Sequence, residues 1–235
     1  MNAILLAAGK ATRLRPISKK KPKCLIKIGK INMLDFWIEN LLKLGVKKIL
    51  INTHYLHDQI VDHIRSHPQK NKIKITYEKN LLGTAGTLLK NLDFFENDGG
   101  FFLHADNYTK QSLKPFQDAH NKRPKNCTIT MMTFKTLDPK NSGIVKTDSK
   151  KRMIKFYEKK KTVFGNIANG AIYLLSKKFI KNYKKINSRA KDFSKDIIPR
   201  CKQKVYCFHT NEFFIDMGTI KNLNLLKKKL KQNSF

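Results

Sequence analysis

Apolar residues in the first half of the chain fall into short runs separated by polar or glycine-containing segments. Residues 3–6 form an apolar run just before Gly9, which is typical of a strand buried in a parallel sheet. Residues 33–44 carry apolar side chains at helical spacing, and Gly45 is suited to end that helix. The same pattern predicts strands at 48–52, 73–77 and 101–105, a helix at 56–65, and a loop followed by a helix at 83–92.

This alternation of strands and helices predicts an α/β fold with a doubly wound, mostly parallel, Rossmann-like sheet. In such sheets, ligands bind beyond the carboxyl ends of the strands. The loop at residues 7–16 and the acidic Asp106 both follow predicted strands. We therefore expect both of them at the ligand-binding edge of the sheet.

The second half of the chain contains more strand-like segments, at residues 128–133, 143–146, 153–158, 169–175 and 205–209. A basic segment at 222–231 has leucines at helical spacing, which predicts a C-terminal helix. No internal repeat and no linker rich in Pro, Gly or Ser divides the chain. We therefore expect a single domain over residues 1–235, with a smaller β subregion in its second half.

Composition and cysteine spacing narrow the class of protein. With 40% hydrophobic residues, the 235-residue chain can bury a core, whereas its apolar runs are too short to span a bilayer. The N-terminus lacks the basic start of a signal peptide, and the four cysteines include no CxxC pair. These features predict a cytoplasmic protein with reduced thiols and no membrane partner.

The net charge of +32 needs its own explanation, because strongly basic proteins often bind nucleic acids. Of the 49 basic residues, 42 are lysine and only 7 are arginine, and the lysines are spread along the whole chain. A nucleic-acid reader would use more arginine for bidentate contacts to bases and phosphates. We therefore expect no specific nucleic-acid partner, although the charge favours the approach of polyanionic nucleotides.

The loop after the first predicted strand carries the strongest chemical signal. Residues 3–16 read AILLAAGKATRLRP, and the basic motif Lys21-Pro22-Lys23 follows shortly afterwards. Small residues let backbone N–H groups approach phosphate oxygens closely, and Arg13 and Lys23 would stabilise a pyrophosphate leaving group. The loop is neither a Walker A loop nor a Rossmann dinucleotide fingerprint, because both need further glycines at fixed spacing.

These residues resemble the sugar-phosphate nucleotidylyltransferase family, whose pattern runs roughly L-A-[AG]-G-x-G-T-R-L-x-P-L-T-x-x-x-P-K-x-L. The chain matches this pattern at Leu6, Ala7, Ala8, Gly9, Thr12, Arg13, Leu14, Pro16, Pro22, Lys23 and Leu25. The resemblance extends along nearly the whole chain. It implies the family's fold and a nucleotidyl transfer that uses Mg²⁺ as cofactor.

The resemblance also implies a role for individual residues. The nucleotide would contact two loops, through Leu6, Ala7, Ala8, Gly9 and Thr12 in the first and Gly83, Thr84 and Ala85 in the second. Catalytic roles fall to Arg13, Lys23 and Asp106, and Mg²⁺ would bind Asp106 and Asp216. The sugar phosphate would contact Glu158, Lys159, Asn169 and Gly170. Residues 1–110 would then form mainly the nucleotide-binding half, and residues 111–235 mainly the sugar-phosphate-binding half with the C-terminal helix.

Two alanines depart from the family pattern. Ala11 stands where the first loop usually has its second glycine, and Ala105 replaces the glycine that usually precedes Asp106. If the backbone at Ala11 has a positive φ, alanine costs about 1 kcal/mol there relative to glycine.

Each assignment has a simpler structural alternative. Asp106 could cap a helix N-terminus, and Asp216 could be a turn residue before Gly218. Lys159 lies in a run of three lysines that could merely be solvated, and Asn169 could form a turn before Gly170.

The expected reaction combines a nucleoside triphosphate and a sugar 1-phosphate into a nucleotide sugar and pyrophosphate, within polysaccharide or glycan biosynthesis. The stretch Asn52-Thr-His-Tyr-Leu-x-x-Gln59 and the expected lack of extra C-terminal domains resemble short guanylyltransferases, which favours GTP with a mannose or heptose 1-phosphate. Uridylyl, cytidylyl or thymidylyl transfer remains an alternative, as does a non-catalytic nucleotide- or sugar-sensing module. The sequence leaves the oligomeric state open, a homo-oligomer included.

Overall fold

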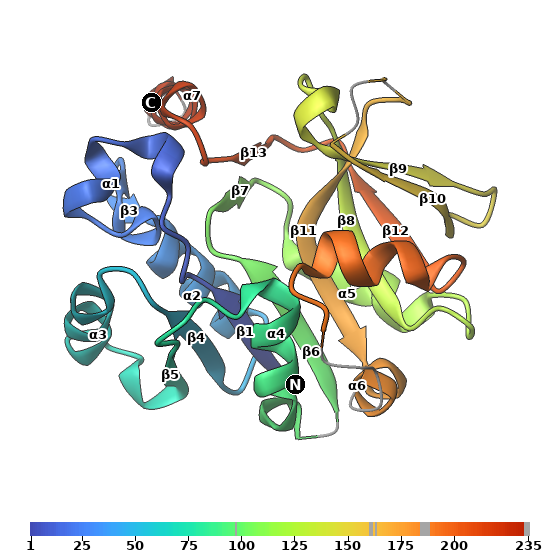
Figure 1. Cartoon of the computed structure of the whole chain (residues 1–235), viewed down its shortest axis with the longest axis horizontal. Helices are drawn as coiled ribbons and strands as arrows, with labels where there is room; N and C mark the ends of the chain where they lie inside the picture. The colour runs from blue at the N-terminus through green and yellow to red at the C-terminus, as the bar shows by residue number, and fades with distance from the viewer. Residues whose placement is uncertain (97, 160–161, 163, 184–188, 233–235) are drawn as a thin grey trace.

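The computed structural model describes residues 1–96, 98–159, 162, 164–183 and 189–232 (Figure 1). The strands are β1 Asn2–Leu6, β2 Lys27–Ile28, β3 Ile31–Asn32, β4 Ile49–Thr53, β5 Ile73–Tyr77, β6 Gly99–His104, β7 Asn107–Thr109, β8 Ile129–Lys135, β9 Gly143–Thr147, β10 Met153–Glu158, β11 Ile167–Ser176, β12 Val205–Thr210 and β13 Phe214–Asp216. The α-helices are α1 Ile17–Lys20, α2 Met33–Lys43, α3 His57–Arg65, α4 Gly83–Lys90, α5 Leu113–Lys122, α6 Lys177–Tyr183 and α7 Ile220–Gln232.

Shorter helical turns connect these elements. They are η1 Thr12–Leu14, η2 Lys23–Leu25, η3 Lys70–Lys72, η4 Leu92–Phe95, η5 Pro139–Asn141, η6 Phe193–Ile197 and η7 Ile198–Cys201. Of these, η6 is a π-helical turn and the others are 3-10 turns.

One nine-stranded sheet runs through the molecule in the order β10-β9-β11-β6-β1-β4-β5, and β8 joins β11 and β12. Strands β6, β1, β4 and β5 are parallel neighbours. Strand β11 pairs antiparallel with β6, β8 and β9, so the second half of the chain adds an antiparallel region. The predicted α/β fold with a central parallel sheet is confirmed.

Helices cover both faces of the parallel strands. Successive side chains of a strand point to opposite faces, and in β1 Ala3 and Leu5 belong to one apolar cluster whereas Ile4 belongs to another. Helices α2, α3, α5 and α7 contribute to the first cluster, while α4, α6 and residues 193–198 contribute to the second. This double cover explains why residues 3–6 of β1 form an unbroken apolar run.

The strands and helices expected from the apolar pattern all occur, with shifted bounds in most cases. Strands β5 and β10 begin and end where the pattern predicts, whereas β11 is longer than the predicted 169–175. Several elements had no counterpart among the expectations: helices α1, α5 and α6, and the two-stranded sheets of β2 with β3 and of β7 with β13. Strands β7 and β13 have three residues each, which is too short for an alternating pattern to emerge.

The small β7–β13 sheet brings distant parts of the chain together. Asp216 lies opposite Asn107 in its register, and the Met217 N–H donates to the Asp106 carbonyl at 2.9 Å. Helix α7 then lies beside the N-terminal segment near β2 and β3 (Figure 1). None of the described helices is both long and apolar enough to cross a membrane.

Trp37 of α2 fixes the strand end that follows Asp106. Its side chain is fully buried, and its Nε1–H donates to the Asn107 carbonyl at 2.8 Å. Asn107 in turn donates from Nδ2 to the Gly170 carbonyl at 2.8 Å, which ties this strand end to β11.

We expect Trp37→Phe to lower the free energy of unfolding by about 2–4 kcal/mol, because it leaves a buried carbonyl unpaired and a small void. Urea denaturation followed by circular dichroism measures this, since the variant has no tryptophan fluorescence. A loss well below about 1 kcal/mol would show that water replaces the indole N–H without penalty.

Candidate active site

A cavity of about 230 Å³ opens at the carboxyl ends of the parallel strands. Its wall includes six of the eight residues expected to contact a nucleotide: Leu6, Ala7, Ala8, Gly9, Gly83 and Thr84. Lys23 and Asp106 also line it. Thr12 and Ala85 do not, and the Ala85 N–H is already bonded to the Lys191 carbonyl at 2.9 Å. The structure thus brings most of the expected nucleotide contacts into one cavity.

Glycine is required where the second loop enters α4. Gly83 has φ +73°, and a Cβ at this position would lie 2.3 Å from the Lys191 carbonyl oxygen. The neighbouring Thr84 accepts a hydrogen bond at Oγ1 from the Phe193 N–H at 2.7 Å. Residues 191–193 therefore hold the second loop against the cavity.

Ala11 has a left-handed backbone, with φ 48° and ψ 44°, at the start of η1. Ala11 therefore has the positive φ at which alanine is less stable than glycine. The next residues turn through η1, whose Leu14 is buried and whose Arg13 is exposed. The chain thus keeps the loop geometry without the usual glycine.

The cavity floor contains a buried hydrogen-bond network that links three strand ends. Asn52, at the end of β4, accepts from the Ala7 N–H at 2.8 Å and donates to Glu78 Oε1 at 3.0 Å. Thr87 Oγ1 also donates to Glu78 Oε1, at 2.6 Å, and the Leu82 N–H donates to Glu78 Oε2 at 3.1 Å. Glu78 is only 2% exposed. The network joins the first loop to the second.

The expectations did not include Glu78, Asn52 or His104, all of which line the cavity. His104 ends β6, Glu78 directly follows β5 and Asn52 is the last residue but one of β4, so the argument that selected Asp106 applies to them as well. The signal was therefore present in the sequence. The sequence does not display the register of the sheet, which decides which of these polar residues line the cavity.

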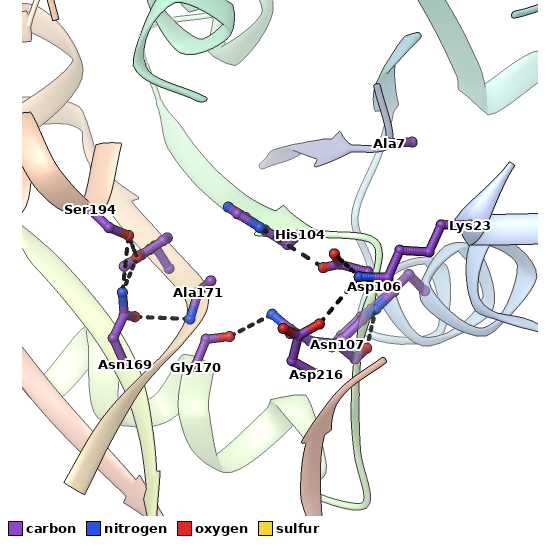
Figure 2. A network of polar contacts seen from close by, with 12 residues as sticks. Ala7, Lys23, His104, Asp106, Asn107, Asn169, Gly170, Ala171, Ser194 and Asp216 are labelled. Carbon is purple, nitrogen blue, oxygen red and sulfur yellow. Dashed lines mark hydrogen bonds and ion pairs between the residues drawn. The ribbon is translucent and has the colours of Figure 1, made fainter. Parts of the chain in front are cut away.

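Lys23 joins the two aspartates expected to bind metal (Figure 2). Its Nζ donates to Asp106 Oδ2 and, at 3.2 Å, to Asp216 Oδ1. The Lys23 side chain is 12% exposed. The structure therefore unites three expected site residues from three separate segments in one ionic cluster.

The charges in this cluster stabilise one another. Burial alone would lower the pKa of Lys23, but the adjacent carboxylates of Asp106 and Asp216 raise it above its ordinary value. Burial alone would raise the pKa of Asp106, but Lys23 and His104 hold it below its ordinary value. Both shifts favour the charged forms, so the cluster holds an ammonium between carboxylates.

Two further basic side chains flank the carboxylates. Arg13 Nη2 lies 4.0 Å from Asp216 Oδ2, and its side chain is 64% exposed. His104 Nδ1 lies 3.9 Å from Asp106 Oδ1, on the side of Asp106 away from Lys23 (Figure 2). His104 lines the cavity, whereas Arg13 does not.

The donor set suits Mg²⁺ only in combination with a substrate. In the part of the chain that the structure describes, no three His, Cys, Asp or Glu side chains converge as a metal site. Asp106 and Asp216 supply two carboxylates, and Mg²⁺ is commonly held by one or two carboxylates together with substrate phosphates. The residues present therefore fit a metal ion that is completed by a nucleotide.

A second polar group lies on β11, beyond Asn107 (Figure 2). Asn169 donates from Nδ2 to the Tyr173 hydroxyl at 2.6 Å and to Ser194 Oγ at 3.2 Å. Its Oδ1 accepts from the Ala171 N–H, and the strand register is irregular between Asn169 and Tyr173. Asn169 is therefore a strand residue at an irregularity of the register, and its local bond to Ala171 is the kind that a turn-forming asparagine makes.

Glu158 and Lys159 lie at the end of β10. The Glu158 carboxylate packs against Gly143, where a Cβ would lie 2.7 Å from Oε2, and burial raises the pKa of Glu158. Lys159 Nζ lies 3.9 Å from Glu158 Oε1 and is more than half exposed. Its partly exposed position agrees with a solvated lysine in a charged run as well as with a contact to a phosphate.

The simpler alternatives for the two aspartates do not hold. Asp106 lies in a turn between β6 and β7, and the next helix, α5, is capped by Ser112. Asp216 is the last residue of β13, and its carboxylate contacts Lys23. Asp106 therefore caps no helix, and Asp216 belongs to a strand rather than to a turn.

Comparison with known proteins places this site in a family. A family model described as "Nucleotidyl transferase" matches residues 2–233. The chain belongs to the nucleotidyl transferase family. The resemblance seen in the first loop is thereby confirmed.

Individual relatives agree with this membership. Mannose-1-phosphate guanylyltransferase 1 of Arabidopsis thaliana is 30% identical over 93% of the chain and 61% of that protein. Mannose-1-phosphate guanylyltransferase catalytic subunit beta of Dictyostelium discoideum is 28% identical over 97% of the chain and 66% of that protein. The chain thus spans somewhat less than two thirds of the length of these relatives.

A solved structure of similar length shows the same fold. The HddC protein of Yersinia pseudotuberculosis, in complex with GMP-PN, is 25% identical and superimposes with a TM-score of 0.79. The match covers 97% of this chain and 99% of that chain.

The left-handed backbone at Ala11 yields a stability prediction. We expect Ala11→Gly to raise the free energy of unfolding by up to about 1 kcal/mol, because the strain removed exceeds the entropy that glycine adds to the unfolded chain. Ala8, in the same loop, has no positive φ. Ala8→Gly should therefore lower stability by about 0.5–1 kcal/mol. Equal effects of both changes in urea denaturation would contradict this explanation.

Proposed function

We propose that this chain transfers a nucleotidyl group from a nucleoside triphosphate to a sugar 1-phosphate, releasing pyrophosphate. The observation that carries the proposal is the contact of Lys23 with Asp106 and Asp216 beside a cavity lined by small-residue loops. Membership of the nucleotidyl transferase family supports it, as do relatives named for mannose 1-phosphate guanylyl transfer.

The reaction needs charge and positioning more than acid–base chemistry. A phosphate oxygen of the sugar 1-phosphate attacks the α-phosphorus, and the bond from that phosphorus to the oxygen bridging to the β-phosphorus breaks. Pyrophosphate leaves with the bonding electron pair. Since the nucleophile is already an anion, no strong base is required.

The residues have complementary tasks in this reaction. Backbone N–H groups of the loop at Ala8 and Gly9 bind the phosphate chain, and the Lys23 ammonium offsets charge that develops at the α-phosphate. The exposed Arg13 stabilises the pyrophosphate leaving group. Mg²⁺, held by Asp106 and Asp216, would screen the α-phosphate from the incoming anion when bound.

We place the sugar phosphate in the second half of the chain, near Asn169, Gly170 and Glu158. Amide and carboxylate groups are suited to hydrogen-bond sugar hydroxyls, and Lys159 would reach the phosphate. The Asn107–Gly170 hydrogen bond supports this placement, because it couples this region directly to the strand end that bears Asp106. Residues 1–110 then bind mainly nucleotide and residues 111–235 mainly sugar phosphate.

We propose guanine as the base because of Glu78. Glu78 lines the cavity, and its carboxylate accepts hydrogen bonds but has no hydrogen to donate. Its Oε2 accepts only one hydrogen bond from the described residues. Guanine is the base with two adjacent donors, N1–H and N2–H. Uracil and thymine offer a single donor, N3–H, between two carbonyl oxygens that the carboxylate would repel. The complex of the HddC protein with GMP-PN and the guanylyltransferase relatives support the same choice.

The reaction is tested by pyrophosphate release with Mg²⁺, each of the four nucleoside triphosphates and a panel of sugar 1-phosphates. We expect Asp106→Asn and Asp216→Asn each to lower the rate by about 100-fold or more, because the charge acting on the α-phosphate is reduced. Asp118→Asn, an exposed control on α5, should retain full activity. A folded wild-type protein that releases no pyrophosphate with any pair would contradict the proposal.

The base is tested by the ratio of kcat/KM for GTP to that for UTP. We expect Glu78→Gln to lower this ratio by about 10- to 100-fold, because a paired set of base contacts contributes about 1–3 kcal/mol of discrimination. Glu39→Gln, an exposed change of the same kind on α2, should leave the ratio unchanged. If Glu78→Gln lowers both values equally, the carboxylate supports the loops without reading the base.

A further inference from the structure

We propose that Lys23 occupies the cation position between Asp106 and Asp216, so that a divalent cation binds there tightly only after a phosphate chain has drawn the ammonium away. This inference rests on the proposed function, since it assumes that the two carboxylates bind metal. It adds an order of events: the cation enters with the nucleotide.

The geometry leaves one position for two cations. Lys23 Nζ contacts Asp106 Oδ2 and lies 3.2 Å from Asp216 Oδ1, so the ammonium takes up one oxygen of each carboxylate that would hold the metal. An ammonium and a divalent ion a few ångströms apart repel each other strongly in a partly buried site. The cation therefore binds the carboxylate pair only if Lys23 moves.

The local charge balance adds to this competition. The two carboxylates face the Lys23 ammonium, and Arg13 Nη2 lies 4.0 Å from the second oxygen of Asp216. The negative charge of the two carboxylates is thus largely neutralised before any ligand binds. Displacing Lys23 alone would also leave a mostly buried ammonium without its partners, which is energetically costly.

A phosphate chain removes that obstacle. Lys23 lines the same cavity as Ala7, Ala8 and Gly9, the loop proposed to bind phosphates. The four-carbon stem of lysine is flexible, so the ammonium can turn from the carboxylates to a phosphate without leaving the cavity. The carboxylates freed in this way, together with the phosphate oxygens, then form the metal site.

The test uses Mn²⁺ as a spectroscopic probe, with binding followed by electron paramagnetic resonance in the absence of nucleotide. We expect Lys23→Met to bind Mn²⁺ at least about tenfold more tightly than the wild-type protein. Lys10→Met removes one exposed positive charge from the same loop and should change the affinity by less than about twofold. Lys23→Gln provides a second neutral variant if Lys23→Met does not fold.

Two outcomes would overturn the inference. In the first, both folded Lys23 variants bind Mn²⁺ no more tightly than the wild-type protein. In the second, the gained affinity persists when Asp216→Asn is added, so that the cation lies elsewhere. Pyrophosphate release by the wild-type protein separates these results from a failure of the proposed function, because transfer can occur whether or not Lys23 competes with the metal.

Discussion

The ionic contact of Lys23 with Asp106 and Asp216 is the interaction on which the site depends. These residues lie 83 and 193 positions from Lys23 in sequence. They meet because β6 lies next to β1 in the sheet and because β13 pairs with β7. Without that small antiparallel pair, Asp216 would have no fixed position near the cavity. The fold thus serves chiefly to hold opposite charges together at the edge where parallel strands end.

Much of the fold of residues 1–110, the half proposed to bind mainly nucleotide, follows from the sequence. The apolar run of β1 and the helical spacing of α2 reflect burial on both sheet faces, which is a local property that the sequence displays directly. The first loop was recognisable from its small residues and from the spacing of Arg13 and Lys23. The motif also indicates that Ala11 is strained if its φ is positive, and its φ is 48°.

The features that escaped sequence reasoning depend on contacts between distant segments. Strands β7 and β13 are too short to show a period, yet they place Asp216. Glu78 and Asn52 are polar residues at strand ends, and only the sheet register shows that they share one buried network with Ala7. Thr12 and Ala85 carry motif positions but do not line the cavity, because sequence spacing does not determine which side chains a turn directs inward.

The central claim is that one cavity binds the triphosphate while Asp106 and Asp216 share its metal ion. The most direct measurement is a crystal structure with Mg²⁺ and a GTP analogue whose α–β bridge cannot be cleaved. We expect the base beside Glu78, Lys23 in contact with a phosphate, and the metal between the two aspartates. A nucleotide bound outside this cavity, or a metal ion that contacts neither aspartate, would contradict the claim.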